Sequence, residues 1–199
     1  MLRLLAIFVT LMFSVTGAYA QHRVPATPYF MDLDIVYKIV CSSGGRGTGF
    51  AVDHNKLVTA AHVVRDQGSC HVNGRPVTVV HIDAATDIAI VSVAVENTRR
   101  FKLSCAGFTP EKSYVGAGYA QGTDFVAQRV MGTDTFAKGD KFGGMRILTG
   151  HFYRGMSGGP VVDENGVVVG IVSGGPILPF IPEALSRELK TTHLCAKPA

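Results

Sequence analysis

The chain has 199 residues, a formal net charge of +4 at pH 7 and 47% hydrophobic residues. This length fits one compact unit or two small ones. The slight excess of positive charge is not clustered, so it gives no support for nucleic acid or an anionic membrane as a partner. Internal repeats, heptads and low-complexity tracts are absent from the sequence.

Residues 1–20 have the pattern of an export signal. Arg3 supplies a positive start, an apolar run follows, and Ala18 and Ala20 form a small-x-small cleavage site. The apolar run is short for a bilayer span, which needs ~20 residues, so a signal is favoured over an uncleaved membrane anchor. We expect cleavage after Ala20, a secreted or periplasmic protein and no stable membrane insertion afterwards. Residues 21–31 are predicted to form an extended N-terminal arm.

Short β-branched runs between glycines predict an all-β protein. Residues 32–100 contain six predicted strands, which suit a first Greek-key barrel that ends at the polar stretch 96–102. These strands are Ile35–Cys41, Gly49–Val52, Lys56–Thr59, Cys70–Val72, Val77–Ile82 and Ile88–Val95. The glycine-rich loop 42–49 lacks the Gly-Lys-Ser/Thr ending of a phosphate-binding loop and no helix follows it. It therefore favours a hairpin connection over a nucleotide site.

Residues 101–199 predict a second six-stranded barrel followed by a helix. Proline suits the first turn of a helix, so the helix is predicted to start at Pro182, with Leu185 and Leu189 four apart on one face. The predicted strands are Tyr114–Ala117, Phe125–Met131, Met145–Leu148, Pro160–Val162, Val167–Val172 and Ile177–Ile181.

Three motifs carry chemistry. Residues 153–160 form a glycine-rich turn that presents Ser157, and its small residues let backbone N–H groups converge on one point. A serine is a poor nucleophile unless a base activates it. His62 and Asp87 lie upstream, each beside an apolar, β-branched run.

The order His62, Asp87, Ser157 makes the sequence resemble the trypsin/chymotrypsin-like serine proteases over residues 32–195. The stretch 180–182 is most similar to the Deg/HtrA-type branch, although we expect no PDZ domain here. The resemblance implies two β-barrels, a terminal helix and an active site in the cleft between the barrels.

The resemblance also implies a role for each residue. His62 would be the general base, Asp87 would fix its tautomer, and Ser157 would be the nucleophile. The N–H groups of Gly155 and Ser157 would form the oxyanion hole. Asp83 is a competing candidate for the carboxylate, but Asp87 matches the motif better.

Specificity and activation are also expected from the resemblance. His151, six residues before the nucleophile, would lie at the base of the primary pocket and favour apolar or acidic residues over Lys and Arg. Ser173 would support the aspartate and, with Gly174 and Gly175, line the substrate. Met156 occupies the position that is acidic in trypsin-type zymogens, so activation by a freed N-terminus is not expected.

Four cysteines allow three pairings. The first and fourth strands of a Greek key are neighbours, which favours Cys41–Cys70 and leaves Cys105–Cys195. A zinc site at Cys41, Cys70, His71 and His62 has no common ligand spacing, and export favours disulfides. We therefore expect no metal and no cofactor.

Together these features predict a serine endopeptidase that acts on polypeptides; they do not indicate an oligomeric state. Two alternatives remain: a catalytically silent homologue that binds peptides or a partner protein, and an esterase-type hydrolase. The esterase alternative lacks the strand–turn–helix context of the Gly-x-Ser-x-Gly motif.

Overall fold

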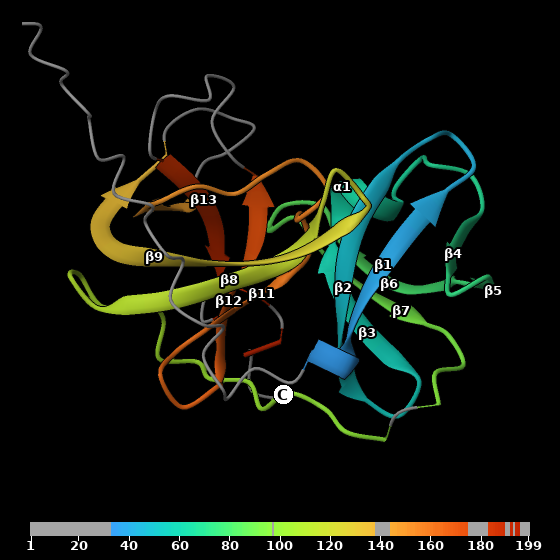
Figure 1. The fold of residues 1–199 in the computed structure, drawn as a ribbon, viewed down its shortest axis with the longest axis horizontal. Helices are drawn as coiled ribbons and strands as arrows, with labels where there is room; N and C mark the ends of the chain where they lie inside the picture. Colours follow the sequence, from blue (N-terminus) through green and yellow to red (C-terminus); the bar gives the residue numbers. More distant parts are fainter. Residues whose placement is uncertain are drawn as a thin grey trace, which may run out of the picture.

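The computed structural model describes residues 33–96, 98–137, 144–174, 183–189, 192, 194 and 195 (Figure 1). The predicted signal at 1–20, the arm at 21–31, the predicted strand Ile177–Ile181, Pro182 and Gly175 lie outside these residues. In the described part of the chain, no helix is long and apolar enough to cross a membrane.

The N-terminal half forms a seven-stranded sheet. Its strand order is β5-β4-β1-β2-β3-β7-β6, and a short helix α1 follows β3. The elements are a 3-10 turn Leu33–Ile35, β1 Val36–Cys41, β2 Arg46–Asp53, β3 Lys56–Ala60, α1 Ala61–Val64, β4 Cys70–Val72, β5 Arg75–Pro76, β6 Thr78–Asp83 and β7 Ile88–Ser92.

This sheet differs from the closed six-stranded barrel that we predicted. Its edge strands β5 and β6 do not pair with each other, although only Val77 separates them in the chain. Strand β5 has two residues, and Pro76 has no N–H to donate to a neighbouring strand. The chain itself passes from one edge to the other, and the result is a half-barrel.

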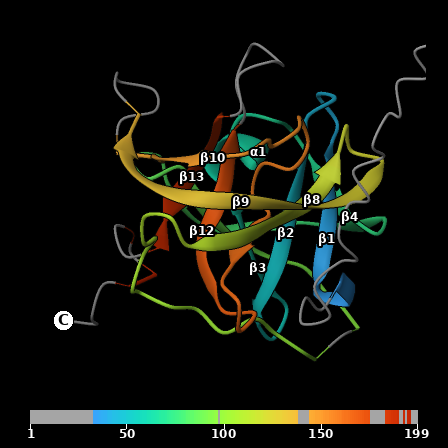
Figure 2. The same cartoon turned by 60° about the vertical axis from the view of Figure 1, so that its left-hand side comes forward.

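The C-terminal half is a closed barrel with the strand order β10-β13-β12-β11-β8-β9. In Figure 1 it lies beside the first sheet. Its long strand β8 contacts β1 and β2, and Figure 2 shows β8 and β9 passing in front of these two strands. Its strands are β8 Ser113–Ala120, β9 Asp124–Phe136, β10 Arg146–Thr149, β11 Pro160–Val162, β12 Val168–Gly174 and β13 Glu183–Glu188. The all-β prediction is confirmed, and every predicted strand within the described residues is present with modest shifts of its ends.

The predicted C-terminal helix is wrong, because residues 183–188 form strand β13. This strand pairs with β10 on one side and β12 on the other, and so closes the barrel. Leu185 and Leu189 share a face in a strand as well as in a helix, since a separation of four fits both periods. Residues 183–188 form a strand because they pair with the edges of both β10 and β12. No local feature of the sequence reveals this pairing.

The buried hydrophobic residues form two clusters, and one of them joins the two halves. The first is centred on buried residues of the N-terminal sheet such as Phe50 and Leu57, and it also contains Val162 and Ile171 of the second barrel. The second fills the barrel interior around Leu148. Because the first cluster spans both halves, the loops at their junction are held in fixed relative positions.

Both predicted disulfides are present. Cys41 and Cys70 are directly opposite each other on β1 and β4, with Cα atoms 3.9 Å apart. Cys105 joins Cys195 across 90 residues of sequence, and it therefore ties the segment before β8 to the residues after β13. Cys41 and Cys70 carry no free thiolate, so they do not form the zinc site that we considered.

Candidate active site

The loop that carries Ser157 is fixed against strand β12. Gly158 N donates to Val172 O at 2.7 Å, and Val172 N donates to Gly159 O at 2.8 Å. These two bonds involve the two residues that directly follow Ser157, and they anchor the turn on the barrel.

Two glycines make this turn possible. Gly155 and Gly158 have φ values of +90° and +86°, in the region that residues with a side chain rarely adopt. A Cβ at Gly155 would lie 2.4 Å from Tyr119 O, and one at Gly158 would lie 2.2 Å from Thr48 O. Backbone atoms cannot move aside cheaply, so both positions require glycine.

Thr48, on β2, joins the two halves at the site, and the sequence analysis missed it. Its N–H donates to Ser157 O and its hydroxyl donates to Gly155 O, both at 2.8 Å. The same hydroxyl accepts from Tyr119 N at 2.9 Å, and the carbonyl of Thr48 accepts from Thr59 Oγ1 at 2.7 Å. Thr48 is fully buried, and every polar group it carries is used. Thr48 lies in the glycine-rich loop 42–49, which predicts only a hairpin connection, so the sequence gives no signal for this role.

His62 lies on α1, directly after β3, and contacts Asp87. Its Nδ1 lies 2.8 Å from Asp87 Oδ2 and 3.1 Å from Oδ1, and its backbone N–H donates to Oδ1 at 3.0 Å. Asp87 has a φ of +57°, and its carbonyl accepts from Ala61 N at 3.0 Å. This short network fixes the orientation of the imidazole ring and leaves Nε2 directed away from the carboxylate.

Asp83, the competing carboxylate, has a local role instead. It accepts hydrogen bonds from Ala85 N at 3.0 Å, from Thr86 N at 3.1 Å and from Thr86 Oγ1 at 2.5 Å. These are the bonds of an Asx-type turn, which shapes the connection between β6 and β7. Asp87, and not Asp83, contacts His62.

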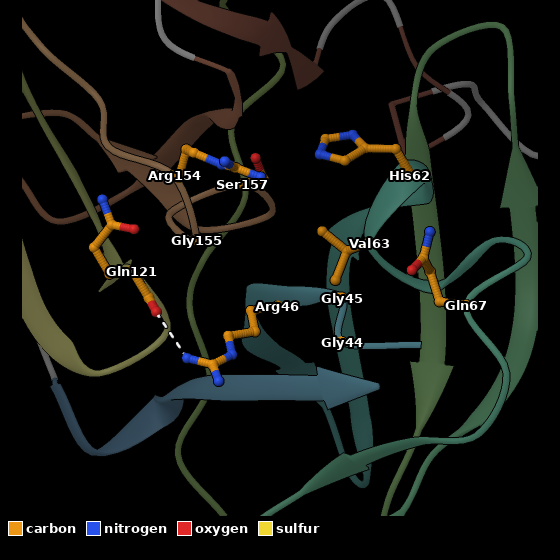
Figure 3. Close-up of a pocket in the computed structure, with 10 residues that line it drawn as sticks. All are labelled: Gly44, Gly45, Arg46, His62, Val63, Gln67, Gln121, Arg154, Gly155 and Ser157. Carbon is orange, nitrogen blue, oxygen red and sulfur yellow. Dashed lines mark hydrogen bonds between the residues drawn. The ribbon is translucent and has the colours of Figure 1, made fainter. Parts of the chain in front are cut away.

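His62 and Ser157 face each other across one cavity, with the imidazole ring pointing toward the serine (Figure 3). His62 Nε2 and Ser157 Oγ, both of described residues, are not hydrogen-bonded to each other in this structure. Such bonds are often long before a substrate binds and tighten in the bound complex.

Two backbone donors beside Ser157 have no partner among the described residues. The N–H groups of Met156, Gly158 and Gly159 all donate within the protein, whereas those of Gly155 and Ser157 do not. Gly155 and Ser157 are only partly buried and face the cavity, so their unused N–H groups are accessible to an external acceptor.

The cavity at Ser157 has a volume of about 450 Å³. Of the residues expected to bind substrate, His151 is half-buried and Ser173 is buried. Ser173 Oγ has no hydrogen-bond partner among the described residues, so it does not support Asp87 as expected. His151, Ser173 and Gly174 lie outside the cavity lining. The lining residues are Gly44, Gly45, Arg46, His62, Val63, Gln67, Gln121, Arg154, Gly155 and Ser157.

Arg187, on β13, is a charged neighbour of the site that the sequence did not reveal. It is 5% exposed and lies directly opposite Ile171, which packs in the cluster shared with the first sheet. Directly opposed residues share a face of a sheet, so Arg187 also faces the first sheet. Burial lowers the pKa of Arg187, and the carboxylates of Asp87 and Asp83 oppose that shift. Because the sequence predicts a helix for this segment, it does not place Arg187 near the site.

Gly158→Ala tests whether this turn tolerates a Cβ at position 158, with Gly74→Ala as its matched control. Gly74 also has a positive φ, +75°, but a Cβ there would have nothing within 4 Å. We expect the control to lose about 1 kcal/mol of unfolding free energy from backbone strain alone. Gly158→Ala should lose about 1–3 kcal/mol more, because its methyl meets Thr48 O. Urea unfolding of both variants measures the difference, and equal losses would contradict the close approach.

Comparison with known proteins gives the family. The model of the trypsin-like peptidase domain matches residues 47–171, a range that contains His62, Asp87 and Ser157. Serine protease Rv3671c of Mycobacterium tuberculosis (strain ATCC 25618 / H37Rv) is 29% identical over 150 residues, which cover 69% of this chain and 38% of that protein. The chain thus spans well under half the length of this curated relative.

Solved structures share the fold. The crystal structure of the active form of the Rv3671c protease has a TM-score of 0.67 and 25% identity, covering 78% of this chain and 76% of that one. The HtrA-type protease AlgW with a tripeptide has a TM-score of 0.68 and 19% identity, covering 79% of this chain and 57% of that one. The chain belongs to the trypsin-like peptidase family.

Proposed function

We propose that this protein is a serine endopeptidase that hydrolyses polypeptides through Ser157, His62 and Asp87. The observation that carries the proposal is one cavity lined by Ser157, by Gly155 and by His62. His62 contacts Asp87 at 2.8 Å behind the cavity, and the N–H groups of Gly155 and Ser157 are unused among the described residues. Nucleophile, base and oxyanion donors are the parts that acyl transfer requires.

In the proposed reaction, Ser157 Oγ attacks the scissile carbonyl while His62 Nε2 takes the hydroxyl proton. The N–H groups of Gly155 and Ser157 stabilise the oxyanion, and each such donor is typically worth about 3–4 kcal/mol of the barrier. His62 then protonates the leaving amine as the peptide C–N bond breaks. Water, deprotonated by His62, releases the acyl group from Ser157, and the proton returns to the serine. No cofactor is needed in any step.

Asp87 serves this cycle by holding the ring and balancing the imidazolium charge. It accepts two contacts from His62, one from the ring and one from the backbone, so it fixes both the tautomer and the orientation. In this scheme Nδ1 keeps its proton throughout, and Nε2 alone exchanges protons with Ser157 and the leaving group.

The acyl part of the substrate is proposed to lie along the end of β12, at Ser173 and Gly174, and to contact Gly175, the next residue of the chain. Its primary side chain is proposed to lie over His151. The absence of a carboxylate at position 151 disfavours Lys and Arg there. Met156 is fully buried and offers no carboxylate, which supports activity without a freed N-terminus. Two disulfides support an exported protein, because disulfides persist in oxidising compartments.

A fluorophosphonate probe tests the proposal on the native protein. We expect stoichiometric labelling, with the adduct on Ser157 by peptide mapping, and hydrolysis of internally quenched peptides at a higher kcat/KM than simple esters. Heat-denatured protein is the control and should not be labelled. A folded protein that binds peptides without labelling would instead be a silent homologue, and turnover of esters alone would make it an esterase.

A further inference from the structure

The cavity at Ser157 extends to one side of the catalytic residues. From His62 and Ser157 it runs over Arg46, Gln67 and Gln121, and it does not include the end of β12 (Figure 3). The proposed function, on which this inference rests, assigns the end of β12 to the acyl part of the substrate. The cavity therefore lies on the leaving-group side of the scissile bond.

Arg46 is held in place across this cavity. It lies at the start of β2, in the first sheet, and its Nη1 donates to Gln121 O of the second barrel at 3.2 Å. Its side-chain stem packs against Gly122, where a Cβ would lie 2.5 Å from Arg46 Cδ. The contact uses one corner of the guanidinium, so its remaining N–H donors are available to a ligand. A group already fixed in position loses little conformational entropy on binding.

Among the described residues, the lining of the cavity carries positive charge from Arg46 and Arg154 and includes no acidic residue. Neither Arg46 nor Arg154 forms an ion pair with a carboxylate of any described residue. Five other described arginines do, and their pairs are Arg65–Asp66, Arg75–Glu96, Arg99–Asp34, Arg100–Asp53 and Arg146–Glu188. The two arginines that face the catalytic cavity are thus left without a carboxylate partner from the described part of the protein.

We propose that this cavity binds acidic side chains of the polypeptide substrate, immediately after the scissile bond, with Arg46 as the main partner and Arg154 as a second. A guanidinium binds a carboxylate through two parallel N–H···O bonds, which adds geometric selectivity to the charge attraction. Gln67 and Gln121 supply further polar contacts at the cavity wall. Specificity on this side therefore rests on charge, unlike the primary pocket over His151.

The test uses internally quenched peptides with one common acyl side and Asp/Glu, Asn/Gln or Lys in the first two positions after the scissile bond. We expect kcat/KM to be about 5- to 20-fold higher for the acidic peptides than for the amide ones, since partly exposed ion pairs give modest gains. Lys peptides should be cut most slowly. The preference should shrink at high salt, because ions screen exposed charges.

Charge reversal identifies the residue responsible. In Arg46→Glu the order of the peptides should invert, with Lys now preferred over Asp and Glu. Arg129→Glu is the matched control: Arg129 is an exposed arginine on β9, bonded to Ser113 Oγ, and it is not in the cavity lining. This control should keep the wild-type order. Arg46→Gln provides a milder variant, which should cancel the preference without inverting it.

Binding measured without turnover keeps this inference separate from the proposed function. Fluorescence anisotropy of labelled peptides that carry the same acidic, amide or basic residues at their amino terminus reports occupancy of the leaving-group side alone. Tighter binding of the acidic peptides with no hydrolysis of any substrate would overturn the endopeptidase and keep the cavity assignment. Hydrolysis of all three peptide classes at equal kcat/KM, or an acidic preference that survives in Arg46→Glu, would overturn the cavity assignment.

Discussion

Ser157→Ala is expected to lower kcat by about a millionfold, to the level that binding and the oxyanion donors supply without a nucleophile. In the described part of the chain, the Ser157 hydroxyl makes no hydrogen bond, so its removal leaves no buried group unsatisfied. The thermal unfolding midpoint should therefore stay unchanged while activity disappears. Burst and steady-state assays on internally quenched peptides measure the loss.

A serine outside the site serves as the control for this substitution. Ser113, at the start of β8, accepts a bond from exposed Arg129, and Ser113→Ala should retain wild-type kcat. The Ser157→Ala protein should also fail to react with the fluorophosphonate while it keeps its affinity for peptides. Near-wild-type turnover in a preparation free of contaminating protease would refute Ser157 as the nucleophile.

The proximity of His62 to Asp87 and of His62 to Ser157 was predictable because each of these residues lies in a short, recognisable stretch. Ser157 lies in a turn whose glycines are required by φ, and His62 follows a β-branched strand directly. Asp87 was distinguishable from Asp83 only through the motif of the family that the sequence resembles. In the structure, Asp83 bonds to the turn that follows it. Cys41–Cys70 followed from strand adjacency alone.

The features that escaped prediction all depend on contacts between segments far apart in the chain. Thr48 is indistinguishable in sequence from other strand threonines until its bond to Gly155, 107 residues away, is seen. Strand β13 has a residue spacing that also fits a helix, and only its pairing with β10 and β12 decides between them. Arg46 lies in the glycine-rich loop 42–49, for which the sequence offers only a nucleotide site or a hairpin connection. Its position in the cavity depends on its hydrogen bond to Gln121 O of the second barrel.

The closed barrel contains a buried ion pair whose disruption should produce the largest loss of stability. Glu188 on β13 is fully buried, and its Oε1 accepts from Arg146 Nη2 at 3.0 Å and from Phe108 N at 2.8 Å. Arg146 on β10 also donates to Thr133 O at 2.9 Å, and its guanidinium lies 4.1 Å from the centroid of the Phe136 ring. The pair therefore links β10 and β13 to β9 and to the segment before β8.

We expect Glu188→Gln to lower the free energy of unfolding by about 3–5 kcal/mol, because it leaves the Arg146 charge buried without its counter-charge. Glutamine keeps an acceptor for Phe108 N and nearly the same volume, so the substitution isolates the charge. The double variant Arg146→Met/Glu188→Leu should cost less than the sum of its two single variants, since it removes both charges and fills the space with apolar groups.

Urea unfolding with the disulfides intact measures these differences, and the surface pair Lys112–Glu164 provides the control. Its side chains are 38% and 69% exposed at a distance of 3.1 Å, and Glu164→Gln should leave the unfolding free energy nearly unchanged because water replaces the lost partner. If Glu188→Gln costs no more than Glu164→Gln, the buried pair does not hold the barrel closed. If the double variant loses as much as its two single variants together, the two charges act independently, and the coupling between β10 and β13 would have to come from their backbone pairing alone.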